Sequence, residues 1–177
     1  MDTLTTDRLT LRPFSTDDVV PMMEMHQDPE VIKHVLLGGA PGGVTVAWRN
    51  VAMLIGHWYL RGYGQWAVVE RATGETIGRV GPYNPEGWPG IELGWIIRRD
   101  RWGHGFATEA ARAALAWMWE HVDTDRVISI IRPDNLRSIR IAEKIGETLD
   151  SHTTINQTDM LVYAARRPPA RHALEAR

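Results

Sequence analysis

Residues 91–110 constrain the fold of this chain more than any other segment. An apolar stretch, 91–97, has the pattern of a buried strand and leads through a run of arginines into a loop that contains Gly103 and Gly105. An alanine-rich stretch with helical spacing follows, from Phe106 to His121. This order places the free N–H groups of a helix start beside a permissive backbone, and such an arrangement binds anions. The flanking arginines can add charge-assisted bonds to a phosphate; they are Arg98, Arg99 and Arg101.

The same pattern has plainer interpretations. A Gly-x-Gly between a strand and a helix also forms a simple tight turn, and exposed arginines also form a solvated face. The loop is not a Walker loop, because no Gly-Lys-Ser/Thr follows it, and it lacks the third glycine of a dinucleotide-binding fingerprint. A nucleotide-binding protein that uses this loop in another way stays a hypothesis.

A second informative segment, residues 132–146, follows the alanine-rich helix. Asn135 or Asp134 is a good cap for the helix predicted from Asn135 to Ile145, and Gly146 is a good stop for it. Helix capping alone therefore explains the residues of this segment, without a functional role. The two segments together, in this order, are far more specific than either one.

The rest of the chain predicts a mixed α/β (α+β) domain in which helices cover a sheet. Gly38–Gly43 cannot be regular structure and is predicted to be a mobile loop. Ala72-Thr73-Gly74 predicts the turn of a hairpin. Strands are predicted around Leu9–Pro13 and at 65–70, 75–80, 91–97, 127–131, 148–155 and 160–165, with helices before and after Asp28-Pro29 and at 47–60, 106–121 and 135–145.

Composition excludes several classes of protein. The chain has 177 residues, of which 44% are hydrophobic, and we expect one soluble domain over 1–166 with a C-terminal tail over 167–177. It has no cysteine, which excludes disulfides and an enzyme thiol, and the net charge of -2 argues against a nucleic acid partner. No His, Asp or Glu spacing predicts a metal. The apolar runs fall short of the ~20 residues of a membrane helix and the N-terminus opens no signal peptide, so a cytoplasmic location is expected.

The chain resembles the GNAT acetyltransferase superfamily, in the branch whose enzymes acetylate the N-terminal amines of ribosomal proteins. The residues that carry the likeness are Thr6–Pro13, Gly94–Ile97, Trp102–Ala110, and Asn135-x-x-Ser138 running to Glu143–Gly146. The resemblance implies a mixed, mostly antiparallel sheet of about seven strands and about four flanking helices, with central parallel strands that splay. It also implies that homodimers are possible.

The resemblance implies acetyl-CoA as co-substrate, bound where the two parallel strands splay. The backbone of Trp95–Ile97 would pair with the pantetheine arm, and the amides of the loop from Trp102 to Ala107 would hold the pyrophosphate. Asn135 would hydrogen-bond the cofactor, and we infer that one of the three arginines reaches the 3′-phosphate. The predicted cofactor residues are Trp95, Ile96, Ile97, Arg101, Trp102, Gly103, His104, Gly105, Phe106, Ala107 and Asn135.

The chain departs from the family pattern at three positions. Trp102 stands where the superfamily loop usually starts with Gln or Arg. Many members of this branch also have a tryptophan at this position. Ala142 stands where many members carry a catalytic tyrosine, so no tyrosine can be assigned there as general acid. Glu147 stands where an aromatic residue commonly follows the glycine that ends the helix.

Three residues are candidates for catalysis. The N–H of Ile96 is predicted to stabilise the oxyanion. Glu92 is the candidate base if it faces the cleft; if it faces outward, it pairs with an arginine on a neighbouring strand. Ser138 matches a serine proposed as the acid in the ribosomal-protein branch, although an exposed helix serine would look the same. Tyr83, Trp66 and Trp88 are candidates for lining the acceptor pocket or for core packing.

These residues predict an acetyl-CoA-dependent N-acetyltransferase that acts on a primary amine, either a protein N-terminus or a small molecule. Because no cysteine can hold the acetyl group, we expect direct transfer in a ternary complex. The alternative is a catalytically silent acyl-CoA-binding module, which would bind acetyl-CoA but release no free thiol with any amine.

Overall fold

The computed structural model describes residues 1–35 and 42–169. Most of the Gly38–Gly43 loop predicted from the sequence therefore lies outside the described residues, as does most of the C-terminal tail. The elements are β1 (Leu4–Thr5), β2 (Leu9–Arg12), the 3-10 turn η1 (Thr16–Asp18), α1 (Val19–Gln27), α2 (Pro29–Ile32), α3 (Val44–Arg61), β3 (Trp66–Glu70), β4 (Thr76–Tyr83), β5 (Glu92–Ile97), the 3-10 turn η2 (Arg99–Arg101), α4 (Phe106–His121), β6 (Arg126–Ile131), α5 (Leu136–Ile145), β7 (Thr148–Ile155) and β8 (Thr158–Arg166).

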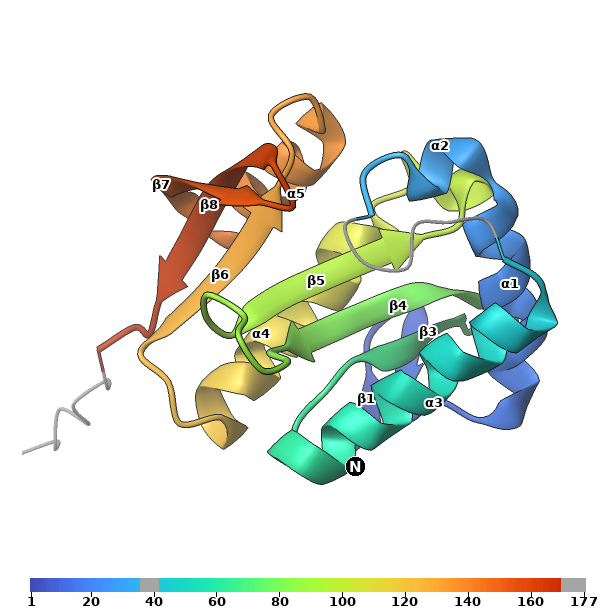
Figure 1. The fold of residues 1–177 in the computed structure, drawn as a ribbon. Helices are drawn as coiled ribbons and strands as arrows, with labels where there is room; N and C mark the ends of the chain where they lie inside the picture. The colour runs from blue at the N-terminus through green and yellow to red at the C-terminus, as the bar shows by residue number, and fades with distance from the viewer. Residues whose placement is uncertain (36–41, 170–177) are drawn as a thin grey trace, which may run out of the picture.

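The strands form one mixed sheet in the order β1-β2-β3-β4-β5-β6-β8-β7 (Figure 1). Every neighbouring pair in it is antiparallel except β5 and β6, which are parallel. The predicted mixed, mostly antiparallel sheet with one central parallel pair is thus confirmed. The two-residue strand β1 was not predicted, because a pair of residues carries no detectable alternation.

The parallel strands β5 and β6 pair only where β5 begins. Glu92 is in register with Ile128, whose N–H donates to the carbonyl of Ile91 at 3.0 Å. Beyond this point the two strands diverge, and the view of the sheet shows them running apart toward their carboxyl ends (Figure 1). The predicted splay is confirmed, and it leaves a gap bordered by the second half of β5.

Helices cover the two faces of the sheet and define two separate packing regions. The helix α4 lies on one face, where its alanines pack against alternate strand residues such as Leu93 and Ile97. The helices α1 and α3 lie on the opposite face, against Ala67 and Ile96 (Figure 1). Residues of β5 therefore alternate between the α4 face and the α1–α3 face, as the pleat of a strand requires.

Asp18, at the start of α1, joins this helix to β2 and β4 through a buried cluster of hydrogen bonds. Its side chain is 0% exposed and accepts bonds from Arg12 (2.7 and 2.8 Å), from the N–H of Ser15 (2.8 Å) and from the hydroxyl of Thr76 (2.7 Å). Burial alone would raise the pKa of Asp18, but these bonds outweigh it and hold the pKa below its usual range. Asp18 is therefore a fully satisfied buried carboxylate.

Across the parts of the chain that the structure describes, none of the helices combines the length and the apolar character needed to cross a bilayer.

Candidate active site

A cavity of about 380 Å³ lies along the gap between β5 and β6. One end is formed by the loop after η2, by α5 and by residues of α2, and the other by Met53 of α3, by Tyr83 of β4 and by Trp88. The cavity thus joins the glycine loop found in the sequence to the α1–α3 face of the sheet, and its two ends have different chemistry.

The glycine loop has the backbone geometry that its sequence predicts. Gly103 and Gly105 both have a φ of 82°, a conformation that side-chain-bearing residues rarely adopt. The helix α4 begins directly after Gly105, so its first N–H groups face the loop. Arg8 links the loop to the first turn of α4: its guanidinium donates to the carbonyl of His104 at 2.9 Å and to the carboxylate of Glu109 at 2.7 Å. Gly103, Gly105, Phe106 and Ala107 line the cavity.

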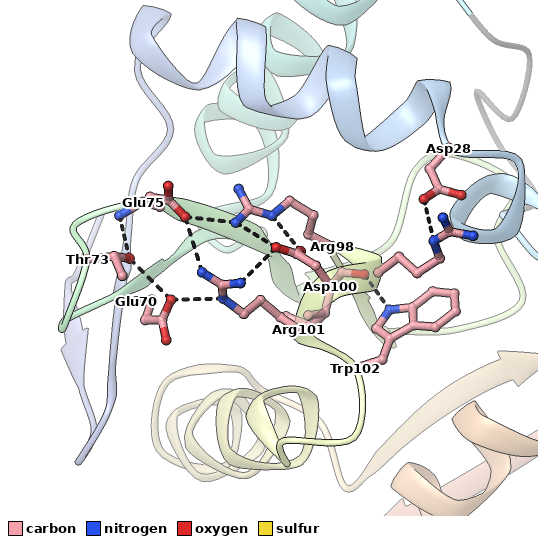
Figure 2. Close-up of polar contacts among 10 residues, drawn as sticks. Asp28, Glu70, Thr73, Glu75, Arg98, Asp100, Arg101 and Trp102 are labelled. Atoms are coloured by element: carbon pink, nitrogen blue, oxygen red, sulfur yellow. Dashed lines mark hydrogen bonds and ion pairs between the residues drawn. The ribbon is translucent and has the colours of Figure 1, made fainter.

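The arginines before the loop are held by carboxylates of the protein itself (Figure 2). Arg98 pairs with Asp100 and with Glu75 of the β3–β4 hairpin, at 2.7 and 2.8 Å. Arg101 lines the cavity but pairs with Glu70 at 3.0 Å and with Asp100 at 2.7 Å. Arg99 pairs with Asp28 at 3.0 Å. These charges are already compensated, so the structure does not favour them as the ligands of a phosphate.

Three cations that the sequence analysis missed line the same end of the cavity. They are spaced three and four residues apart on one side of α5, and they are Arg137, Arg140 and Lys144. Within the described parts of the chain, none of them has a carboxylate within 4.0 Å. Arg137 stacks over the ring of Trp102 at 4.3 Å. The signal in the sequence was their helical spacing after Asn135.

The register of β4 and β5 decides which backbone groups face the gap. The N–H of Arg98 donates to the carbonyl of Ile77 at 2.8 Å, and bonding alternates along an antiparallel pair. The amide of Ile96 therefore points toward β4, away from the gap where its predicted oxyanion role needs it. The amides of Trp95 and Ile97 point into the gap. The indole N–H of Trp102 donates to the carbonyl of Ile97 at 2.7 Å.

Glu92 lies at the opposite end of the cavity and faces into it. Its carboxylate accepts a bond from the indole N–H of Trp88 at 2.8 Å, and it lies across the strand pair from Tyr83. Burial raises the pKa of Glu92 to about 7, against the opposing effects of Trp88, Arg79 and the backbone of Ile130. Of the two alternatives for Glu92, the structure therefore selects the one in which it faces the cleft.

Two of the three aromatic candidates line the cavity beside Glu92. Tyr83 and Trp88 do so, with their rings edge to face at 6.0 Å. Trp66 instead is fully buried in the core, where it contacts Trp58 and Trp117 at 5.1 Å each. The core-packing alternative is correct for Trp66.

Ser138 and Asn135 line the cavity near Trp95. The indole N–H of Trp95 donates to the hydroxyl oxygen of Ser138 at 3.3 Å, which leaves the hydroxyl proton of Ser138 available to another group. The side-chain oxygen of Asn135 accepts the N–H of Ser138 at 3.2 Å and so caps α5, as predicted.

Glu147, at the position where an aromatic residue was expected, lies beneath the gap. It is 2% exposed and lies 3.0 Å from the hydroxyl of Ser129, which also contacts the carbonyl of Leu93 at 2.8 Å. A hydroxyl has one proton, so Ser129 donates to Leu93 only if Glu147 donates to Ser129. Burial raises the pKa of Glu147 to about 8, and a protonated Glu147 fits this arrangement.

A family model described as an acetyltransferase (GNAT) domain matches residues 8–148. The chain belongs to the GNAT acetyltransferase family. This GNAT acetyltransferase is 34% identical over 151 residues to the uncharacterized protein YkkB of Bacillus subtilis (strain 168), covering 81% of this chain and 83% of YkkB.

Solved structures show the same architecture. An acetyltransferase from Agrobacterium tumefaciens str. C58 superposes with a TM-score of 0.82 at 32% identity, covering 94% of this chain and 95% of that one. RimL, a ribosomal alpha-N-protein acetyltransferase in complex with coenzyme A, superposes with a TM-score of 0.79 at 16% identity, covering 93% and 98%. The resemblance to the GNAT acetyltransferase superfamily is thus confirmed, and the protein is an acyltransferase.

Among the described residues of this GNAT acetyltransferase, no group of three or more His, Asp or Glu side chains is placed to hold a metal ion.

Proposed function

We propose that this enzyme transfers the acetyl group of acetyl-CoA directly to a primary amine within a ternary complex. The observation that carries the proposal is the gap between β5 and β6, where backbone amides of β5 face a cavity that has cations at one end and Glu92 at the other. An extended ligand that pairs with β5 would span both ends.

Each part of acetyl-CoA has a matching surface. The pantetheine arm would pair with the backbone of Trp95 and Ile97. The pyrophosphate would accept bonds from the amides of the loop over residues 103–107. The 3′-phosphate would lie against Arg137, Arg140 and Lys144, which takes over the role that the sequence analysis gave to the arginines before the loop. The coenzyme A bound to RimL supports this choice of ligand.

The chain's own groups can carry the transfer. Acetyl-CoA supplies a thioester, and the C–S bond breaks as the amine nitrogen forms an N–C bond to the carbonyl carbon. Glu92 takes the proton that the amine loses, directly or through a water. The N–H of Trp95 points into the gap just beyond the paired end of β5, and it stabilises the oxyanion in place of Ile96. Ser138 donates a proton to the departing thiolate and regains one from solvent, and Glu92 releases the proton of the amine to solvent.

Thermal unfolding with and without acetyl-CoA tests the cofactor site. Acetyl-CoA at about 100 times its Kd adds about 2.7 kcal/mol, which is about 5–10 °C in Tm for a chain of this size. Arg140→Glu is expected to remove most of this shift. Arg49→Glu makes the same charge change on an exposed part of α3 outside the cavity lining, so it should keep the shift.

Equal shifts in wild type and Arg140→Glu would refute the assignment of the α5 cations. The release of free thiol in the presence of an amine panel then separates the enzyme from a silent acyl-CoA-binding module. A module would show the thermal shift and no thiol release.

Replacement of Ser138 by alanine tests the proposed acid. Because the thiolate of coenzyme A is a fair leaving group, we expect kcat to fall by about 10-fold, below the usual range for a general acid. Ser151→Ala, an exposed serine on β7, is the matched control. An unchanged kcat in Ser138→Ala would mean that this serine has no part in the chemistry.

A further inference from the structure

Arg79 is a charged group in the cavity that neither the proposed cofactor site nor the proposed acid–base chemistry uses. It lies on β4 opposite Ile96, on the same face of the strand pair as Glu92. Among the described residues no carboxylate lies within 4.0 Å of it. Burial lowers the pKa of Arg79 to about 10, so the guanidinium stays protonated at neutral pH.

A second side chain fixes the direction in which Arg79 can bind. The carboxamide oxygen of Gln65, a residue that is 2% exposed, accepts a bond from one end of the guanidinium. The carboxamide nitrogen lies beside Gly94, where a Cβ atom would approach it to 3.0 Å. Gly94 thus leaves the room that Gln65 needs, and Gln65 holds Arg79 with its remaining N–H groups toward the cavity.

Between Arg79 and Glu92 the wall of the cavity is formed by the side chain of Gln65, which lies over a pair of glycines. Gly81 and Gly94 face each other on the rung that separates the two charged residues. The oxygen of Glu92 lies 4.0 Å from where a Cβ of Gly94 would be. Arg79, Gln65 and Glu92 all line the cavity, so a ligand can lie over Gln65 with one end at each charge, and each charge shifts the pKa of the other.

The missing anion does not come from the cofactor. The phosphates of acetyl-CoA are assigned to the glycine loop and α5, whereas Arg79 shares with Ile96 the face of the sheet that α1 and α3 cover, and the pantetheine arm and thioester carry no charge. His26, whose pKa burial and Arg79 lower to about 4, is neutral and supplies no negative charge. An incompletely paired guanidinium in a cavity is costly without a partner. Glu92 lies beyond 4.0 Å of Arg79 and acts on it only through space, so a carboxylate of the acceptor can complete the pairing.

We propose that the acceptor is an amine that also carries a carboxylate, which Arg79 binds in a bidentate pair while the amine lies at Glu92. The proposal rests on the acetyl transfer proposed above and narrows its acceptor. A planar guanidinium matches the two oxygens of a carboxylate, and the bonds are charge-assisted. The same arrangement disfavours polycationic acceptors, because a second positive charge on them would meet Arg79.

The experiment compares amino acids with their own primary amides, which differ only in the carboxylate. Thiol release is measured for glycine, β-alanine and 4-aminobutanoate, each against its amide, together with peptides that begin with Glu or with Gln. Wild type is expected to show kcat/KM about 10- to 100-fold higher for the acid of the best pair, the range of a hydrogen-bonded charge pair. A preference for the free amino acids over their amides indicates a small-molecule acceptor. A preference found only for the peptide that begins with Glu over the one that begins with Gln indicates a peptide acceptor.

Two variants test Arg79 itself. Arg79→Gln is expected to reduce the preference for the acid to about threefold or less. Gln65→Glu gives Arg79 an internal carboxylate of the same shape and should also abolish the preference, which keeps the test decisive if Arg79→Gln does not fold. Arg126→Gln removes a half-buried arginine that pairs with Asp150 outside the cavity lining, and it should behave as wild type.

The outcomes separate this inference from the function on which it rests. Turnover of acid and amide at equal kcat/KM overturns the inference and leaves the acetyltransferase proposal in place. A thermal shift with acetyl-CoA but no thiol release with any amine overturns the function. If all panel members turn over too slowly to rank, binding of N-acetylglycine and of its amide to the enzyme with coenzyme A is compared by calorimetry, and equal affinities overturn the inference.

Discussion

Replacing Glu92 by glutamine is expected to lower kcat by about 10²- to 10⁴-fold, the usual contribution of a general base. Glutamine keeps the shape of the side chain and can still accept the bond from Trp88, but it cannot take a proton from the amine. The loss should appear with the best amine of the panel and with acetyl-CoA binding unchanged, because Glu92 lies at the end of the cavity away from the α5 cations.

The pH profile gives this prediction a second measurement. A base works when it is deprotonated, and the pKa of Glu92 is raised to about 7. The kcat of wild type is therefore expected to fall about tenfold for each pH unit below pH 7, and the kcat of Glu92→Gln should not show this decrease. Glu86→Gln changes an exposed glutamate of the preceding loop and serves as the control. A Glu92→Gln enzyme with the kcat and pH profile of wild type would exclude Glu92 as the base.

Asp18→Ala is expected to destabilise the protein by about 3–5 kcal/mol, the cost of breaking a buried charge pair from one side. The substitution leaves the guanidinium of Arg12, the hydroxyl of Thr76 and the N–H of Ser15 without their acceptor. For a chain of this size such a loss lowers Tm by about 6–20 °C, measured by calorimetry or circular dichroism. Asp17→Ala, the exposed neighbour, should shift Tm by about 2 °C or less.

Acid provides an independent check on Asp18. Its pKa is below the usual range in the folded protein, so its contribution to stability is present above the pKa of the unfolded chain and is lost as the pH falls through the folded value. The difference in stability between wild type and Asp18→Ala should therefore shrink at low pH. A difference that stays constant down to the acid transition would show that the charge of Asp18 is not what stabilises the fold.

Much of the fold could be predicted because local patterns and tertiary packing agree. The helix over 106–121 was predicted with its observed bounds, since the glycines before it require a positive φ that only they adopt easily. The two strands of the 65–83 hairpin and the helix stop at Gly146 followed from turn and cap chemistry. The strand β1 was missed, because its pairing with β2 is set by the tertiary structure and not by its two residues.

The candidate site could be predicted only in part, for two physical reasons. The sequence shows which residues are charged but not which of them form ion pairs within the protein. Arg98 and Arg101 pair with glutamates of the β3–β4 hairpin, while the cations of α5 face the cavity. The direction of a backbone amide depends on strand register, so Ile96 could not be distinguished from Trp95 without the pairing of β4 and β5. Arg79 looked like an ordinary residue of a hairpin strand, and only the cavity gives it a role.

The gap between β5 and β6 also makes the second half of β5 an edge strand inside the sheet. An exposed strand edge is a template on which another polypeptide can add a strand, and this is a common start of aggregation. Here the edge lies in the middle of the fold, between two halves that pair at Glu92 and Ile128. If acetyl-CoA covers this edge, the enzyme kept with coenzyme A should form less β-rich aggregate on heating than the enzyme kept without it. The cofactor would then also protect the second half of β5 by occupying the position of a neighbouring strand.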